Sequence, residues 1–155
     1  MSISRFRLTS VALSLLFALA FQTAASAQTP ITKKINVPEE DRFVPFAVTI
    51  HVGDSIEWIN NDEDDHTVVS VDKFTTAGHR GTNHLLPGLE SNNDQPGTFT
   101  LTFHRKGRFV YYCRFHAKLD SDNQPMAPGP DGGIEVKKNF GTPMSGIVVV
   151  LPANQ

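Results

Sequence analysis

The sequence predicts an all-β fold, a Greek-key antiparallel sandwich or barrel of about seven or eight strands. After the N-terminal segment, short runs of β-branched and aromatic residues alternate with Gly, Pro, Asn and Asp. Several runs alternate apolar and polar positions, as at Val48, Ile50 and Val52, which is the period of a strand with one buried face. Helical periodicity is scarce in the same region, so strands packed as a sandwich or barrel are the expected architecture.

The expected strands are ordered by the turn residues between them. They are ITKKINV (31–37), AVTIHV (47–52), SIEWIN (55–60), HTVVSV (66–71), TFTLTFH (98–104), RFVYYC (108–113) and GIVVVL (146–151). VGDS at 52–55 is typical of a tight turn between the second and third runs, and KG at 106–107 between the fifth and sixth.

Two stretches do not fit regular strands. Residues 73–97 form a long polar connection, and residues 119–143 are rich in Pro, Gly, Asp and Asn. Loops of this length in a compact domain are usually functional or disordered.

The N-terminus has the pattern of a secretory signal peptide. Arg5 and Arg7 supply a positive start, residues 11–21 are almost wholly apolar, and ASA at 25–27 offers small residues for cleavage. The apolar run is too short to span a bilayer well, although an uncleaved anchor is the alternative. We therefore expect a signal peptide over 1–27, a single domain over 28–155, a periplasmic or secreted location, and no stable membrane insertion after cleavage.

The charge balance gives no electrostatic reason to bind nucleic acid. Two of the 14 Lys and Arg residues lie in the signal peptide, which leaves 12 against 16 Asp and Glu. A mildly acidic domain lacks the basic surface that neutralises phosphates.

Cys113 is the only cysteine in the chain, and an exported protein meets an oxidising compartment. A single thiol cannot form an internal disulfide. It is therefore an inert buried thiol, a partner in an intermolecular disulfide, or a thiolate held by a metal, and the neighbouring residues must decide between these.

The residues around Cys113 favour a metal. His116 follows it by three positions, and His66 opens an expected strand, where a ligand can project between loops. Met144 precedes the last strand and is a candidate soft axial donor. A thiolate, two imidazoles and a distant thioether form the trigonal site that suits copper in electron transfer. Copper would also explain how one thiol survives export, as a deprotonated ligand.

At these motifs the chain resembles the cupredoxins, the small blue copper proteins of the plastocyanin, amicyanin and azurin group. FVPFAVTIHVGDSIEWINNDEDDHTV is similar to the first half of the family, GRFVYYCRFH to its second half, and PMSGIVVVL to its closing strand. The resemblance implies one copper ion per chain. It also implies the four ligands His66, Cys113, His116 and Met144, and a bracing role for the side chain of Asn61 next to the ligand loops.

The chain departs from that family between His116 and Met144. The family places its methionine three to five residues after the second histidine, whereas here Met144 lies 28 residues after His116, so about two dozen residues are inserted, at about 119–143. Loop closure permits this, because its entropic cost grows slowly with length. Three axial assignments stay open: Met144, Met126 within the insertion, or no methionine, with an oxygen donor or Leu119 filling the space.

The expected function is that of an exported, monomeric one-electron carrier, not an enzyme. Its redox partner proteins would dock transiently near His116 and the 119–143 loop. The alternatives are a copper-delivery protein, or an open, non-blue copper site with a catalytic or sensing role. His79 and His84 could clasp a second metal, whereas His51 and His104 are expected on the surface.

Overall fold

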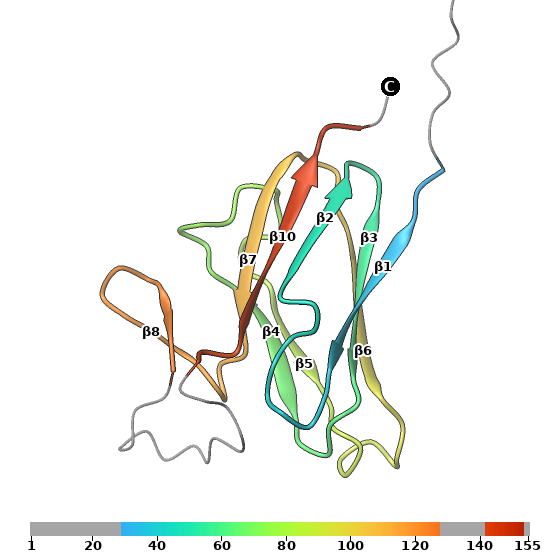
Figure 1. The fold of residues 1–155 in the computed structure, drawn as a ribbon, viewed down its shortest axis with the longest axis vertical. Helices are drawn as coiled ribbons and strands as arrows, with labels where there is room; N and C mark the ends of the chain where they lie inside the picture. Colours follow the sequence, from blue (N-terminus) through green and yellow to red (C-terminus); the bar gives the residue numbers. More distant parts are fainter. Residues whose placement is uncertain (1–28, 128–141, 154–155) are drawn as a thin grey trace, which may run out of the picture.

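The computed structural model describes residues 29–127 and 142–153, and every regular element in them is a β-strand. Figure 1 shows two main sheets packed face to face, with a small hairpin at one side. This confirms the all-β sandwich. None of the described residues forms a helix with the length and apolarity that a membrane span needs.

The strands divide into two mixed sheets and a hairpin. The first sheet has the order β1 (Thr32–Val37), β3 (Ser55–Asn60) and β6 (Gly97–Thr102). The second has the order β2 (Ala47–His51), β10 (Ser145–Leu151), β7 (Gly107–Tyr112), β4 (His66–Ser70) and β5 (Asn83–Leu86). The hairpin pairs β8 (Lys118–Leu119) with β9 (Pro125–Met126).

All seven expected runs form strands, but the pairing is not purely antiparallel. β1 pairs parallel with β3, and β10 pairs parallel with β2. Both pairs join strands that are not consecutive in the chain, so a connection crosses from one sheet to the other between them.

The expected connection at 73–97 contains one strand, β5, which pairs antiparallel with β4. Its first three residues are exposed and only Leu86 is buried, so it carries no alternation that would reveal it in the sequence. Pairing with β4 stabilises it instead.

The core lies between the two sheets and is rich in aromatic side chains. In β3, buried and half-buried residues alternate, which turns Ile56, Trp58 and Asn60 inward. Trp58 contacts Tyr111 edge-on, with ring centroids 5.3 Å apart, and stacks with Phe99 at 5.8 Å. This interior fixes the two sheets against each other.

The pairing of the second sheet brings three distant segments to one end of the sandwich. β7 runs antiparallel to both β4 and β10. Its last residue, Tyr112, pairs with Ser145 at the start of β10 and with Val69 in β4, so the chain that follows β7 continues toward the start of β4. His66 is the first residue of β4, Cys113 directly follows β7, and Met144 directly precedes β10. The fold thus places the predicted ligands together.

Candidate metal centre

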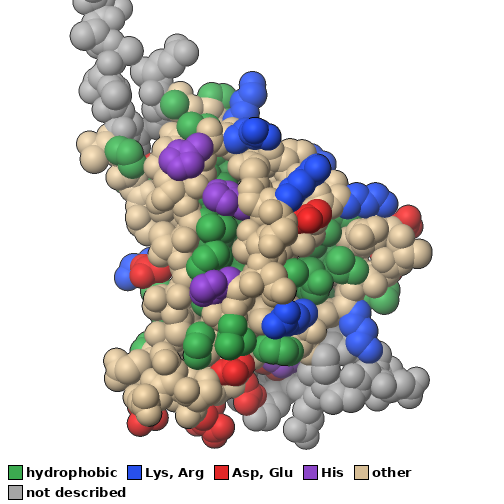
Figure 2. All heavy atoms as spheres, turned by 180° about the vertical axis from the view of Figure 1, so that it is seen from behind, with side chains coloured by type: hydrophobic (Ala, Val, Ile, Leu, Met, Phe, Trp, Pro, Cys, Tyr) green, Lys and Arg blue, Asp and Glu red, His purple; other side chains and the backbone are tan. Residues whose placement is uncertain are grey.

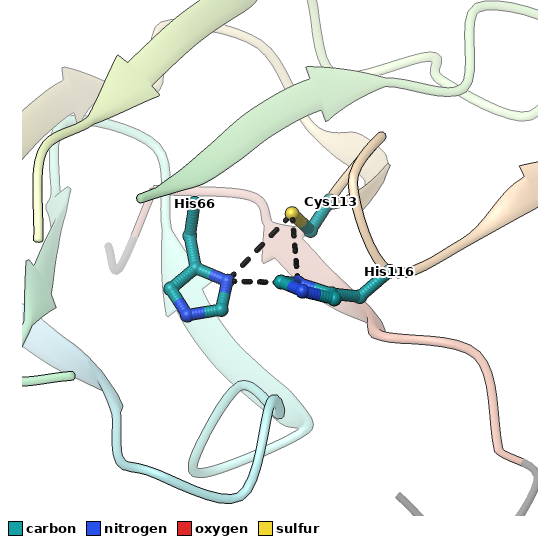
Figure 3. A group of neighbouring side chains, drawn as sticks. All are labelled: His66, Cys113 and His116. Carbon is teal, nitrogen blue, oxygen red and sulfur yellow. Dashed lines mark hydrogen bonds between the residues drawn. The ribbon is translucent and has the colours of Figure 1, made fainter. Parts of the chain in front are cut away.

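Three predicted ligand side chains converge in the interior at this end (Figure 3). The Sγ atom of Cys113 lies 3.7 Å from Nδ1 of His66 and 3.6 Å from Nδ1 of His116, and the two Nδ1 atoms are 3.1 Å apart. His66 and Cys113 are fully buried, and His116 is 7% exposed. Three soft or borderline donors therefore face one shared point, shielded from water.

Backbone hydrogen bonds hold the ligand loop in place. The Cys113 N–H donates to the Met144 carbonyl at 2.9 Å, and the Met144 N–H donates to the His116 carbonyl at 3.3 Å. The Arg114 N–H donates to the Thr67 hydroxyl at 3.0 Å, which ties the loop to β4. The donors are thus held by bonds that do not depend on a metal.

The surroundings of Cys113 favour its thiolate. Burial raises the pKa of the thiol, but the hydrogen bond and charge of His116 lower it, as do the Phe115 backbone N–H and the Thr67 hydroxyl. The net result is a pKa below the ordinary value for cysteine. Since the thiolate is the form that binds metals, the pocket prepares Cys113 to act as a ligand.

Two buried carboxylates lie behind the histidine rings. Oδ2 of Asp62 is 3.0 Å from Nε2 of His66. Oδ1 of Asp41 is 3.8 Å from the same Nε2 atom and 3.6 Å from Nε2 of His116. A carboxylate at Nε2 favours the tautomer whose Nδ1 lone pair faces the metal. The His66 ring, whose Nε2 lies within hydrogen-bonding distance of Asp62, is therefore oriented to offer Nδ1.

The methionines differ sharply in burial. Met144 is 1% exposed and hydrogen-bonds through its backbone to both Cys113 and His116, whereas Met126 is 45% exposed in the hairpin. Leu119 is half-buried in β8. Of the three axial assignments, this arrangement favours Met144. Residues 128–141 of the predicted insertion at 119–143 lie outside the described residues.

The bracing residue is Asn60, so the prediction of Asn61 is wrong. The Asn60 side chain is fully buried and donates to the carbonyls of Asp64 and Leu86 at 2.9 and 3.0 Å. Asn61 is exposed, and its amide makes a 3.4 Å contact with Asn36. The reason is strand parity: Asn60 shares the inward face of β3 with Trp58, and Asn61 lies past the end of the strand.

The other histidines do not join the centre. His79 bonds through Nε2 to the Thr102 carbonyl at 2.9 Å, and His84 stacks on Phe99 with centroids 3.9 Å apart. Among the described residues, neither belongs to a cluster of three or more metal-binding side chains. His104 is exposed, as expected, whereas His51, at the end of β2, is half-buried.

Sequence reasoning did not identify Asp41 or Asp62. An acidic run such as 62–65 is usually a solvated turn, and Glu63 and Asp64 are exposed. Asp62 is 5% exposed and turned toward His66, four residues on. The spacing of four residues between Asp62 and His66 was the sequence signal that could have indicated this contact. Asp41 comes from a loop distant in sequence from both histidines, so no local signal indicated its position.

The donor set fits copper. A thiolate and two imidazoles, enclosed in the interior, match the donors of the trigonal blue-copper site in softness and number, and the buried Met144 is hydrogen-bonded through its backbone to the loop of Cys113 and His116. Hard ions that need six or more oxygen ligands do not fit these donors.

Comparison with known proteins identifies a family. Residues 32–120 match the family described as copper binding proteins, plastocyanin/azurin family, over more than half of the chain. Similar solved structures include a mutant amicyanin in the Cu(I) state, with 18% identity over 77% of this chain and 82% of that one at a TM-score of 0.50. A purple cupredoxin from Nitrosopumilus maritimus shares 19% identity over 76% and 98%, at a TM-score of 0.48. Amicyanin from Paracoccus versutus shares 18% over 76% and 79%, at 0.46. The chain belongs to the plastocyanin/azurin family of copper-binding proteins.

Proposed function

We propose that this protein is a one-electron carrier that holds a single copper ion between His66, Cys113, His116 and Met144. The observation that carries the proposal is the convergence of one sulfur and two nitrogen donors within 3.7 Å of one another in a buried pocket. When bound there, copper supplies a one-electron couple between Cu(I) and Cu(II).

The chain contributes a rigid arrangement of the donor residues. Cys113, His116 and Met144 are joined by backbone hydrogen bonds, and the Asp62 carboxylate orients the His66 ring. Donors that keep one arrangement in both oxidation states need little rearrangement during electron exchange. The site serves a carrier better than an enzyme, because its donors are enclosed and leave no open position for a substrate.

Electron exchange requires a partner to approach the centre. His116 is the least buried of the three donors, so we propose that partners dock over it, next to the described part of the 119–143 loop. An apolar groove of about 510 Å³ lies at the same end, between the start of β2 and the residues that flank Met144. Phe46 in its wall is 60% exposed. An apolar surface of this kind suits a small, transient redox interface.

The charge around this end suggests the chemistry of the partner. Figure 2 shows the molecule from behind. Asp and Glu side chains gather at the lower end of this view, and most Lys and Arg side chains lie above them. Glu63, Asp64, Glu90 and Asp94 are exposed in the turns beside β4 and β5. We propose a redox protein with a basic docking surface, which acidic charges would steer over a distance set by ionic strength. We also propose that the protein is periplasmic or secreted, and that it is a monomer.

Spectroscopy of the Cu(II)-loaded protein tests the function. A carrier should show an intense thiolate-to-copper band in the visible spectrum and a reversible potential. Cys113→Ser should abolish the band; a band that persists would refute the assignment. A colourless protein that readily hands Cu(I) to a chelator would indicate copper delivery instead.

Two methionine variants test the axial ligand. Met144→Leu should raise the reduction potential, because a thioether donor to copper is lost, whereas Met126→Leu should leave it unchanged. The opposite pattern would place the axial ligand in the hairpin.

A further inference from the structure

The two ligand histidines share one buried carboxylate, that of Asp41. It belongs to the connection between β1 and β2, far from both histidines in sequence, and is 3% exposed. Its backbone has φ of 51°, in the left-handed region that non-glycine residues seldom occupy. A non-glycine residue kept in that conformation inside a protein often marks a functional position.

Asp41 lies close to both histidine rings. Its Oδ1 atom lies within 4 Å of Nε2 in His66 and in His116, on the side of each ring opposite to Nδ1. Asp62, by contrast, reaches only His66. At 3.6 and 3.8 Å, Asp41 acts on the rings as a nearby charge and not through a short hydrogen bond.

Two charged residues, Glu40 and Arg42, flank Asp41 on this connection. Arg42, the next residue, is exposed, and its guanidinium lies 3.8 Å from the Glu40 carboxylate. The carboxylates of Asp41 and Asp62 lie behind rings that are themselves shielded from water. Charges interact strongly in such surroundings because water screens them little.

We propose that Asp41 is a positioning residue that sets the reduction potential by acting on both ligand imidazoles. Its negative charge stabilises the more highly charged Cu(II) form relative to Cu(I), so it holds the potential low. This inference rests on the proposed copper function. It assigns to Asp41 a charge effect on both ligand histidines.

The test compares the copper-loaded full protein with charge-removing variants in redox titrations. Asp41→Asn suits the positive φ, since Asn tolerates the left-handed region. Asp41→Gly suits it as well and places no new amide against Nε2. At a fixed solution potential, we expect both variants to raise the ratio of Cu(I) to Cu(II) about tenfold, on the scale of a buried unit charge nearby. That is a shift of about 59 mV for a one-electron couple.

Asp54→Asn is the matched control. Asp54 is also a buried carboxylate, 4% exposed, but it lies in the turn between β2 and β3 at the other end of the sandwich. This variant should change the ratio by less than twofold, and Asp41→Glu, which keeps the charge, should stay near the wild-type value.

The proposal is overturned if both folded Asp41 variants stay within twofold of wild type. Loss of copper binding in both would also overturn it, because a residue that acts through its charge is not needed to bind the ion. These results are distinct from failure of the carrier function, which would show as a wild-type protein without the thiolate band or a reversible potential.

Discussion

The Asn60 side chain joins the loop that precedes His66 to the end of β5, and removing it should loosen the metal end of the sandwich. Its Nδ2 donates to the carbonyls of Asp64 at 2.9 Å, Leu86 at 3.0 Å and Pro87 at 3.2 Å. Its Oδ1 accepts from the Asp62 N–H at 3.1 Å. Asn60→Ala deletes all of these contacts.

The magnitude follows from the number of bonds that the side chain can make. An amide nitrogen carries two hydrogens, so its three acceptors share two full bonds, and Oδ1 adds a third. At about 1 kcal/mol for each bond, the free energy of unfolding should fall by about 3 kcal/mol. A change of that size lowers the Tm of a domain this long by roughly 10 °C.

Urea unfolding of the copper-free protein measures this directly, since bound metal would add its own stabilisation. The midpoint should fall with the m-value unchanged. Asn61→Ala is the control: it removes one exposed 3.4 Å contact and should cost less than about 0.5 kcal/mol. A loss below about 1 kcal/mol for Asn60→Ala, or equal losses for both, would refute the bracing role.

Three further predictions concern other buried groups. Tyr111→Phe should leave the free energy of unfolding unchanged or raise it, because the buried hydroxyl has no hydrogen-bond partner among the described residues; a loss above about 1 kcal/mol in urea unfolding would contradict this. Gly146→Ala should cost about 1–3 kcal/mol, since a Cβ there would meet the Tyr111 ring at 2.5 Å in a packed interior; an unchanged Tm would show that the ring can move aside. Asp54→Asn should lower the free energy of unfolding at neutral pH. It should also make this free energy fall less steeply as the solution is acidified. Burial raises the pKa of Asp54, but the N–H groups of Ile31 and His51 and nearby positive charges outweigh this and lower it. The stabilisation is therefore complete above the unfolded pKa, near 4, and lost as pH falls through the lower folded value; wild type and variant losing stability in parallel below pH 4 would contradict it.

The parts of the fold that sequence predicted correctly are those with a local signal. Strands such as β3 show their alternation in the sequence, and Cys113 lies three residues from His116, so one loop carries half of the ligand set. The start of β4 could be located from the turn before it, which placed His66 at a strand end. In each case neighbouring residues are enough to define the structure.

The features that sequence missed depend on contacts between distant segments. β5 is defined by its pairing with β4, and Asp41 is buried by elements far from it in the chain. The error at Asn61 is different, because it was avoidable. A tryptophan in a strand usually points into the core, and the period of two in a strand puts Asn60, not Asn61, on the same face as Trp58.

The position of β10 has a consequence for how the protein is made. It is the last strand in sequence order, yet it lies inside the second sheet, between β2 and β7. Until it is synthesised, β2 and β7 each present an unpaired edge, and the segment with Met144 is missing from the ligand end. A partly translated chain therefore lacks one side of this end, and the pocket around Cys113 can be completed only after β10 has been synthesised.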